Sequence, residues 1–249
     1  MRRFFTNDKC TVGELCTLTD QEAHHITHVL RMQACQDIII CNGDGMDYTA
    51  TIQSVGATVS ALIKSATPSQ SEPKCRITLY QGLAKGDKME ELFTRCCEAG
   101  VAAFVPVQCA RSVAKWDAKD APKKLDRLNK HILSACKQCG RAYVPTLSSP
   151  LNTAQASAKS HQLKLVAYED EATVSLSRVI KDTNCTDIAV FIGPEGGIDK
   201  NEISTLKANG WQSVSLGKRI LRTENAGFAA SVLILGLLGD MDAKETEHE

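Results

Sequence analysis

Two glycine-bearing turns near the end of the chain constrain its fold most strongly. The first, residues 192–198 with the sequence I-G-P-E-G-G-I, follows the apolar run 188–192 and precedes Asp199 and Glu202, whose spacing is typical of a helix start. The second turn lies within residues 216–226. Open α/β sheets bind ligands where a strand ends in such a turn, because glycine lets the backbone approach the ligand closely. The two turns therefore predict an α/β domain with one ligand site.

Alternating strand and helix patterns over the middle of the chain agree with this prediction. A helical stripe of apolar side chains predicts a helix over residues 87–99, ended by Gly100. Strands are predicted over 102–107 and 163–168, and a basic helix over 122–138. The last helix, predicted over residues 224–238, is apolar on nearly every side, which favours burial that includes a second subunit.

The first 72 residues are predicted to form a small β-barrel domain. A short helix over residues 24–32, with Ile26, Val29 and Leu30 as its apolar positions, precedes three strand candidates. These strands are expected over residues 38–40, 48–52 and 59–63. The polar, proline-containing stretch 65–73 is typical of a linker. We therefore expect one domain over residues 1–72, a second over 73–245, and a polar tail over 243–249.

Composition excludes several classes of protein. The chain has 249 residues, of which 43% are hydrophobic, but it contains no run of 18 apolar residues, and residues 1–5 are followed by polar residues. Neither a membrane span nor secretion is predicted, and a cytosolic location is expected. The eleven scattered cysteines favour reduced, mostly buried thiols over a disulfide framework.

The net charge of zero conceals an uneven distribution of charge. Residues 73–150 hold 14 Lys and Arg against 7 Asp and Glu, whereas residues 1–72 hold 5 against 8 and residues 151–249 hold 10 against 14. The excess of bases is concentrated between Arg111 and Arg141. Such a basic surface suits a polyanion such as RNA, and a solvated helix face is the alternative.

Other ligand-binding motifs are absent or incomplete. Residues 82–88 and 217–219 both depart from the phosphate-loop pattern G-x-x-x-x-G-K-[ST], and G-x-G-x-x-G does not occur, which disfavours a nucleoside triphosphatase and an ordinary dinucleotide enzyme. His24 and His28 have helical spacing but no evident third ligand, so no metal is predicted. The lone C-x-x-C at residues 136–139 is interpreted as two ordinary thiols.

Arg222 and Glu224 are the charged residues of most interest, because they open an apolar helix beside the glycine turns. A guanidinium there can hold a carboxylate or phosphate group. For Glu224, an ion pair with Arg219 or a simple helix-start carboxylate is the alternative role.

Four motifs follow one another along the chain: H-H with V-L-R-M in residues 24–32, Q-x-G-R with V-P in residues 138–145, I-G-P-E-G-G at 192–197, and L-G-x-R-I-L-R-T-E at 216–224. Together they resemble the motifs of the 16S rRNA uridine N3 methyltransferases of the SPOUT superfamily, and the resemblance covers the whole chain. It implies an N-terminal PUA-like β-barrel for RNA binding and a C-terminal α/β domain with a deep trefoil knot. It also implies S-adenosylmethionine as cofactor and a homodimer.

The resemblance also implies roles for individual residues. The implied cofactor-binding residues are Ile192, Gly193, Pro194, Glu195, Gly196, Gly197, Leu216, Gly217, Ile220, Leu221, Arg222, Thr223 and Ala226. The expected RNA-binding residues are Arg2, Arg3, Arg31, Arg111, Lys123, Lys124, Arg127, Gln138 and Arg141. Arg222 is expected to orient or stabilise the target and Glu224 to act as general base or to support it. A valine at Gly196 is expected to block the cofactor while leaving the fold largely intact.

The chain departs from the pattern of this family at four positions. Lys218, Asn225, Lys137 and Ala110 stand where Pro, Thr, Glu and Glu are usual, and the changes at 137 and 110 leave substrate preference open. The expected activity is methylation of uridine N3 in 16S rRNA of the small ribosomal subunit. Two alternatives remain: a noncatalytic RNA-binding assembly factor, and a SPOUT methyltransferase that acts on tRNA or on a ribose 2′-hydroxyl.

Overall fold

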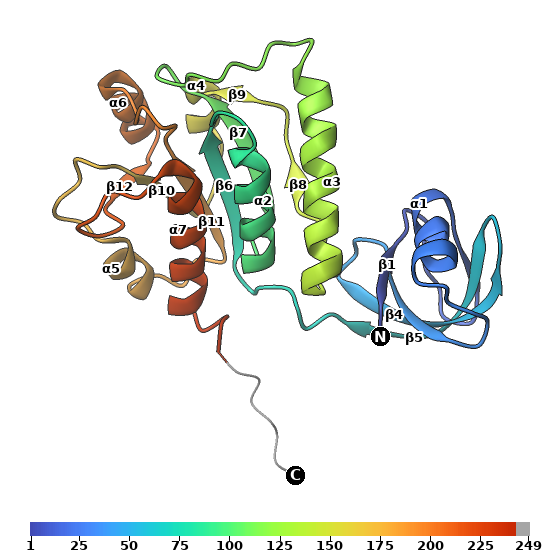
Figure 1. Cartoon of the computed structure of the whole chain (residues 1–249). Helices are drawn as coiled ribbons and strands as arrows, with labels where there is room; N and C mark the ends of the chain where they lie inside the picture. The colour runs from blue at the N-terminus through green and yellow to red at the C-terminus, as the bar shows by residue number, and fades with distance from the viewer. Residues whose placement is uncertain (243–249) are drawn as a thin grey trace. The chain divides into compact units, whose positions relative to one another are not determined.

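A computed structural model of the chain describes residues 1–242 (Figure 1). The chain forms two compact units: unit 1 contains Met1–Glu72 and Cys136–Val144, and unit 2 contains Pro73–Ala135 and the chain from Pro145 onward. Helix α3 (Ala121–Cys139) therefore begins in unit 2 and ends in unit 1. The tail expected over residues 243–249, and with it the end of the domain expected over 73–245, lies outside the described residues.

Unit 1 is built on one five-stranded sheet with the strand order β1-β3-β4-β5-β2. Strands β1 (Arg3–Phe5) and β3 (Asp37–Cys41) are parallel, and β4 (Met46–Val55), β5 (Val59–Pro68) and β2 (Leu15–Leu18) continue the sheet in antiparallel pairs. Because β1 and β2 do not pair with each other, the sheet is an open half-barrel rather than the closed barrel expected from the sequence.

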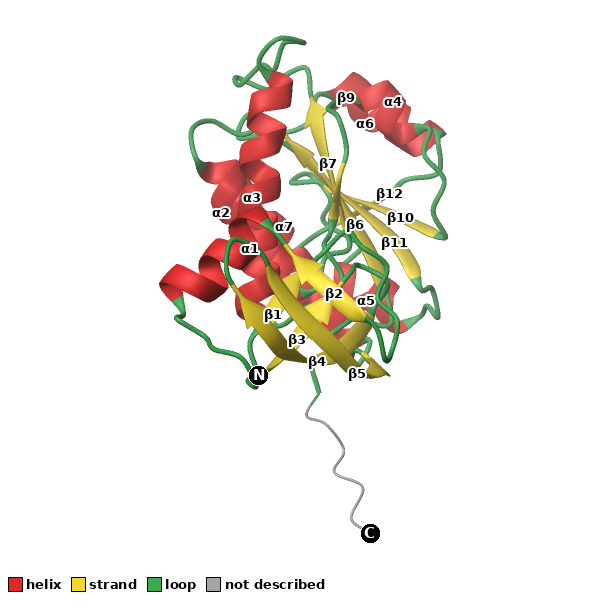
Figure 2. Ribbon diagram, turned by 90° about the vertical axis from the view of Figure 1, so that its right-hand side faces the viewer, coloured by secondary structure: helices red, strands yellow, loops and turns green. Residues whose placement is uncertain are grey.

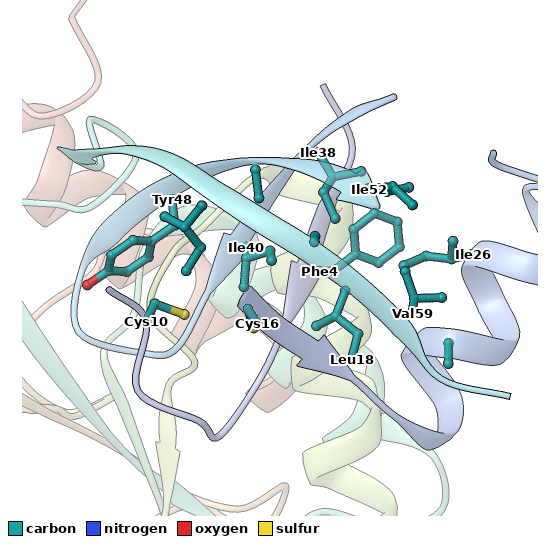
Figure 3. Close-up of a cluster of buried hydrophobic side chains, with 14 residues drawn as sticks. Phe4, Cys10, Cys16, Leu18, Ile26, Ile38, Ile40, Tyr48, Ile52 and Val59 are labelled. Carbon is teal, nitrogen blue, oxygen red and sulfur yellow. The ribbon is translucent and has the colours of Figure 1, made fainter. Parts of the chain in front are cut away.

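A short helical segment covers the core of unit 1. Helix α1 (Asp20–His24) continues directly into a π-helical turn (His25–Val29), so the helix expected over residues 24–32 begins earlier and ends earlier. Ile26 is fully buried and points toward Phe4 and Val59 in the core of the sheet (Figure 3). The side chain of Val29 is 60% exposed, because the wider π-helical turn changes the helical periodicity on which the prediction rested.

An ion pair fixes the chain segment that follows α3 within unit 1. The Arg141 side chain is only 3% exposed, and its Nη2 donates to Oε2 of Glu72 at 2.7 Å. The other oxygen of Glu72 accepts hydrogen bonds from the backbone N–H groups of Ala142 and Tyr143, at 2.9 and 3.0 Å. Arg141 was expected to contact RNA, but its burial against Glu72 makes it a structural residue of unit 1.

Replacing Arg141 with alanine should lower the free energy of unfolding by about 2–3 kcal/mol, because the largely buried Glu72 carboxylate loses its counter-charge. Urea denaturation of the full chain measures this change. Lys123→Ala, on an exposed position of α3, is the control and should alter stability by less than about 0.5 kcal/mol. Equal effects of the two substitutions on the free energy of unfolding would show that the buried ion pair does not contribute more to stability than an exposed side chain does.

Unit 2 contains one parallel sheet with the strand order β12-β10-β11-β6-β7-β8, in which β9 also pairs with β7. Its strands are β6 (Arg76–Gly82), β7 (Ala103–Gln108), β8 (Thr146–Leu147), β9 (Leu151–Asn152), β10 (Leu163–Ala167), β11 (Asp187–Ile192) and β12 (Gln212–Val214). Helices cover both faces, which is why the central strands are apolar almost throughout. The predicted α/β class is confirmed.

The helices of unit 2 form a layer on each side of this sheet (Figure 2). They are α2 (Lys88–Ala99), α4 (Thr153–Ser157), α5 (Leu176–Lys181), α6 (Lys200–Ala208) and α7 (Thr223–Leu237), together with most of α3. Helices α4 and α6 lie on one side, and α2, α3 and α7 lie on the other. Helix α2 ends where predicted, at Gly100, whose φ of +108° is a conformation that favours glycine.

Helix α7 is buried on one side only within a single chain. Ala226, Ala230 and Ile234 are buried, and the helix packs against α2, β6 and β11. Phe228 and Val232 remain partly exposed on the other side, and Leu233 is 37% exposed. A single chain therefore does not bury α7 on every side, although the sequence favours such burial.

Candidate functional site

The two glycine turns enclose one cavity in unit 2, with a volume of about 630 Å³. It lies at the carboxyl ends of β10, β11 and β12, beside the first residue of α2. The residues expected to bind a cofactor all line it: Ile192, Gly193, Pro194, Glu195, Gly196, Gly197, Leu216, Gly217, Ile220, Leu221, Arg222, Thr223 and Ala226. Glu224 lines it as well, so the structure brings the two turns together as predicted from their positions after strands.

A buried hydrogen-bond chain joins the two turns. The hydroxyl of Thr223, the first residue of α7, donates to the carbonyl oxygen of Gly193 at 2.6 Å. The same hydroxyl accepts from Nε2 of Gln81, at 2.8 Å, and Gln81 is fully buried near the end of β6. This chain fixes the start of α7 against the first turn and so sets the shape of the cavity.

The glycines of the first turn are required mainly by packing within the protein. A Cβ on Gly193 would lie 2.7 Å from Cγ1 of Ile198, and a Cβ on Gly196 would lie 2.9 Å from the carbonyl oxygen of Arg111. The expectation that Gly196→Val leaves the fold intact is therefore wrong, because the new side chain would collide with the backbone at Arg111. In contrast, Gly217 has a φ of +120° and faces open space.

Three charged side chains form an ion cluster in the cavity wall. The Nζ atom of Lys88 lies 3.2 Å from Oε1 of Glu195 and 3.5 Å from Oε2 of Glu224. Glu224 is 9% exposed, and its Oε2 atom is buried without a hydrogen-bond partner in the described residues. The sequence offered Arg219 as a partner for Glu224, but the structure pairs Glu224 with Lys88.

Within the cluster, the pKa values of Lys88 and Glu195 move toward their charged forms. The hydrogen bond to Glu195 raises the pKa of Lys88 above its ordinary value. Partial burial of Glu195 acts to raise its pKa, but the backbone N–H of Lys85 and the Lys88 ammonium outweigh this effect, and the pKa of Glu195 is lowered. Lys88 is therefore a cation at neutral pH.

Three further cations line the cavity on one exposed loop. Lys218, Arg219 and Arg222 have no ion pair or hydrogen bond from their side chains to any other part of the chain between residues 1 and 242. Arg222 is the residue that immediately precedes α7. Ile220, between these bases, is 88% exposed, which leaves an apolar side chain free to cover a ligand.

A third wall of the cavity and one of its cations were not predicted from the sequence. Ala167, Tyr168 and Glu169 line the cavity from the end of β10. Their place after a predicted strand was a usable signal, but the sequence does not reveal that β10 is the neighbour of β11. Lys88 was considered only as part of a phosphate loop, for which its spacing from Gly82 is wrong.

The predicted RNA-binding residues divide between the two units. In unit 2, Arg111 is paired with Asp199 at 3.3 Å, Arg127 with Glu90 at 3.0 Å, and Lys123 is exposed. Lys124 is half-buried, with Nζ 5.5 Å from the ring centroid of Trp116. In unit 1, the exposed members of the set are Arg2, Arg31 and Gln138.

Arg3 and Arg141 of the same set are engaged within unit 1. Arg3 pairs with Asp47, and its side chain is 11% exposed. Arg141 pairs with Glu72, as described above. Burial and an internal carboxylate partner leave both guanidinium groups poorly placed for phosphate contacts.

Two other sequence features have simple structural outcomes. His24 and His28 stack with their ring centroids 4.6 Å apart, and residues 1–242 contain no group of three or more side chains that could hold a metal ion. None of the helices in this described part of the chain is both long and apolar enough to cross a membrane.

Two known domain families match the chain. The RNA methyltransferase domain family matches residues 70–235, and the RNA methyltransferase PUA domain family matches residues 18–59. The chain belongs to this RNA methyltransferase family. The resemblance inferred from the four sequence motifs is thereby confirmed at the level of the family.

Named relatives of this methyltransferase extend over nearly its whole length. The ribosomal RNA small subunit methyltransferase E of Bacillus subtilis is 32% identical, over 91% of this chain and 93% of its own length. The protein of the same name from Synechocystis is also 32% identical, over 89% of this chain and 73% of its own.

Solved structures show the same fold. The Neisseria gonorrhoeae ribosomal RNA small subunit methyltransferase E, bound to S-adenosyl methionine, has a TM-score of 0.86 and 30% identity, over 95% of this chain and 98% of its own. A Legionella pneumophila methyltransferase in complex with the same cofactor has a TM-score of 0.84 and 30% identity, over 94% and 96% of the two chains.

Proposed function

We propose that this RNA methyltransferase transfers a methyl group from S-adenosylmethionine to N3 of a uridine in 16S rRNA. The observation that carries the proposal is the cavity between the two glycine turns, in a chain whose relatives of this fold hold S-adenosyl methionine. The names of the curated relatives support ribosomal RNA of the small subunit as the substrate. The N3 position follows from the motif resemblance.

The residues of the cavity fit this cofactor. Its volume of about 630 Å³ is within the usual range for small-molecule sites. The turns at residues 192–197 and 216–223, with Ala226, would hold the cofactor, the turns largely through backbone groups. The carboxylate of Glu224 supplies an acceptor in the wall, because its Oε2, although 3.5 Å from the Lys88 ammonium, accepts no hydrogen bond in the described residues. Once bound, S-adenosylmethionine supplies an electrophilic methyl carbon and a neutral thioether as leaving group.

Glu224 and Arg222 are the proposed reactive side chains of the chain itself. Uridine N3 carries a proton that must leave before the nitrogen can attack a methyl group, and a carboxylate at the start of α7 can accept it. Arg222 is exposed at the mouth of the cavity, where its guanidinium can orient the target nucleotide. Closing the exposed loop around Ile220 over the ligands would exclude water from the reacting atoms.

The target uridine must be accessible on its Watson–Crick edge, because N3 lies there. An unpaired or extruded uridine meets this requirement, so an irregular rRNA region is the expected substrate. The PUA domain and the basic helix α3 are the proposed RNA-binding elements. The proposed setting is the assembled small subunit, in the cytoplasm.

RNA binding should depend strongly on salt through three bases of α3, of which Lys123 and Arg127 are exposed and Lys124 is half-buried. Replacing Lys123, Lys124 and Arg127 with alanine should lower the magnitude of the slope of log affinity against log salt by about 2, because each lost phosphate contact removes about 0.7–0.9. Filter binding to 16S rRNA between low and physiological salt measures the slope. Lys207→Ala, on an exposed position of α6, is the control, and a triple variant with the wild-type slope would assign these bases to a merely solvated surface.

A homodimer through the exposed side of α7 is part of the proposal. Phe228, Val232 and Leu233 form an apolar strip on the side of α7 that a single chain leaves partly exposed, and a second copy of the chain would cover this strip. Light scattering should give the mass of a dimer at micromolar concentration. Leu233→Asp should shift the population to monomers, and a wild-type monomer under these conditions would contradict the proposal.

The trefoil knot is also proposed. Strand β12 lies at the edge of the sheet, yet α7, which follows it, packs against β6 and β11 near the middle. The chain therefore crosses back over the strand ends before α7 begins. This crossing supports a knotted path, which the resemblance implies.

The substrate class can be tested by following a labelled methyl group. The full chain is incubated with labelled S-adenosylmethionine and, separately, with small ribosomal subunits, naked 16S rRNA and tRNA. Label should enter 16S rRNA, and assembled subunits should accept more than naked RNA. Transfer to tRNA alone would favour the alternative of a SPOUT methyltransferase that acts on tRNA. RNA binding without any methyl transfer would favour the noncatalytic assembly factor.

A further inference from the structure

We propose that Lys88 is a catalytic residue, whose ammonium donates a hydrogen bond to a carbonyl oxygen of the target uracil and stabilises the negative charge that the ring gains when N3 loses its proton. This inference rests on the methyl transfer proposed above. It adds a role for a side chain on α2, outside both glycine turns.

The position of Lys88 makes this contact available. Its side chain lines the cavity and is 37% exposed, so it is accessible to a molecule bound in the cavity. An ammonium has three N–H donors. The carboxylate of Glu195 accepts one of them at 3.2 Å, and the carboxylate of Glu224 lies at ion-pair distance, 3.5 Å away. At least one N–H is therefore available to an acceptor in the cavity.

The helix itself does not explain a cation at this place. Lys88 is the first residue of α2, and the positive end of a helix dipole disfavours a cation there, whereas acidic residues such as Glu90 and Glu91 are favoured. Its surroundings in the cavity wall, not the stability of α2, therefore account for a lysine here. The two carboxylates come from the first turn and from the start of α7, so the ammonium is held between the two segments that form the cofactor cavity.

Fixed charge distinguishes Lys88 from the other cations of the cavity. Electrostatic stabilisation of a transition state is most effective when the donor is already in place before the reaction. Lys218, Arg219 and Arg222 lie on an exposed loop without side-chain partners in residues 1–242, so each must lose conformational freedom on binding. Lys88 is held by two ion pairs, which makes it the preorganised cation of the site, while Arg222 retains the proposed role of orienting the nucleotide.

The chemical step balances with this assignment. The N3–H bond breaks and the proton passes to the Glu224 carboxylate, which leaves a negative charge shared by N3 and the two ring carbonyl oxygens. A hydrogen bond from the Lys88 ammonium to one of these oxygens stabilises that charge. The electron pair on N3 then forms a bond to the methyl carbon as the carbon–sulfur bond breaks, and its electrons pass to the sulfur.

Lys88→Met and Lys85→Met are the matched pair of variants that test the role. Lys85 is exposed three residues earlier, and its contact with Glu195 is made by its backbone N–H, which methionine retains. Lys88→Met should lower the rate constant for methyl transfer about 100-fold at pH 7, as loss of one charge-stabilising donor does. Its affinity for S-adenosylmethionine, measured by calorimetry, should stay within about threefold of wild type. Lys85→Met should match wild type in both measurements.

The pH dependence provides a readout that a structural role would not change. Without the ammonium, ionisation of N3–H in the complex requires a higher pH, so the deficit of Lys88→Met should shrink to about tenfold or less by pH 9. The other titratable or charged groups in the cavity wall are Tyr168, Glu169, Glu195, Lys218, Arg219, Arg222 and Glu224. All of them are retained in the variant, but Glu195 and Glu224 lose the counter-charge of Lys88. Lys88→Arg keeps that counter-charge and is therefore compared at every pH as well.

Lys88→Arg keeps a cation, so its rate of methyl transfer should stay within about tenfold of wild type, with the wild-type pH profile. It also serves as the test variant if Lys88→Met fails to fold. A Lys88→Met deficit that is equal at every pH, or one that matches its loss of cofactor affinity, would overturn the catalytic role and make Lys88 structural. If wild type forms no N3-methyluridine at any pH, the proposed function fails first, and with it the role of Lys88.

Discussion

A leucine in place of Ala226 is expected to reduce the affinity for S-adenosylmethionine about 100-fold or more, which corresponds to at least about 2.8 kcal/mol. Ala226 is a nearly buried residue of α7, and its methyl group lines the cavity. A leucine adds three carbon atoms at a wall formed by fixed backbone, so the ligand and the new side chain compete for one volume. Isothermal calorimetry of the full chain measures the loss directly.

Ala208→Leu is the control for this substitution, because Ala208 ends α6 on an exposed position away from the cavity. It should leave cofactor affinity unchanged. Circular dichroism should show that both variants are folded. Normal cofactor binding by a folded Ala226→Leu variant would place the cofactor elsewhere and would contradict the assignment of the cavity.

Glutamine in place of Glu224 is expected to lower the rate constant for methyl transfer about 1000-fold, within the range found for a general base. The substitution keeps the shape of the side chain and removes its capacity to accept the N3 proton. Cofactor affinity should change by less than about threefold, because glutamine keeps an oxygen acceptor in the wall. Single-turnover transfer to 16S rRNA, with cofactor in excess, separates the chemical step from binding.

Glu98→Gln makes the same change on an exposed position of α2 and should have no effect. If Glu224→Gln lowers cofactor affinity by the same factor as it lowers the rate constant for methyl transfer, the carboxylate acts in binding alone. In that case Glu224 belongs to the structural alternative, as a helix-start carboxylate paired with Lys88.

Strong periodic patterns allowed much of the fold to be predicted from the sequence. The apolar stripe that includes Met89, Leu92 and Phe93 correctly predicted α2, because an α-helix places residues at this spacing on one side, where they can be buried together. The D-x-x-E pattern predicted the capping box that Asp199 and Glu202 form at the start of α6. Strand β12 has only three residues, and helices α4 and α5 have five and six, so their periodic signal is too weak to recognise.

Long-range pairing accounts for what the sequence could not predict. Arg141 looked like an exposed base among other bases, and only the fold shows that Glu72, 69 residues earlier, lies beside it. Lys88 meets Glu195 and Glu224 because the segments that follow β6, β11 and β12 converge. The glycine turns were found because glycine at a strand end is a local signal, whereas the partners of a side chain depend on the order of strands in the sheet.

The central claim is most directly tested by mass spectrometry of nucleosides. Small ribosomal subunits that lack the modification are incubated with the protein and S-adenosylmethionine, and their 16S rRNA is digested to nucleosides. We expect one new product, N3-methyluridine, and a reverse-transcription stop next to the modified base, because the methyl group removes the Watson–Crick donor. Arg222→Ala should lose this stop while keeping much of its cofactor affinity. A methyl group on a ribose oxygen, or no methylated uridine in 16S rRNA, would contradict the account.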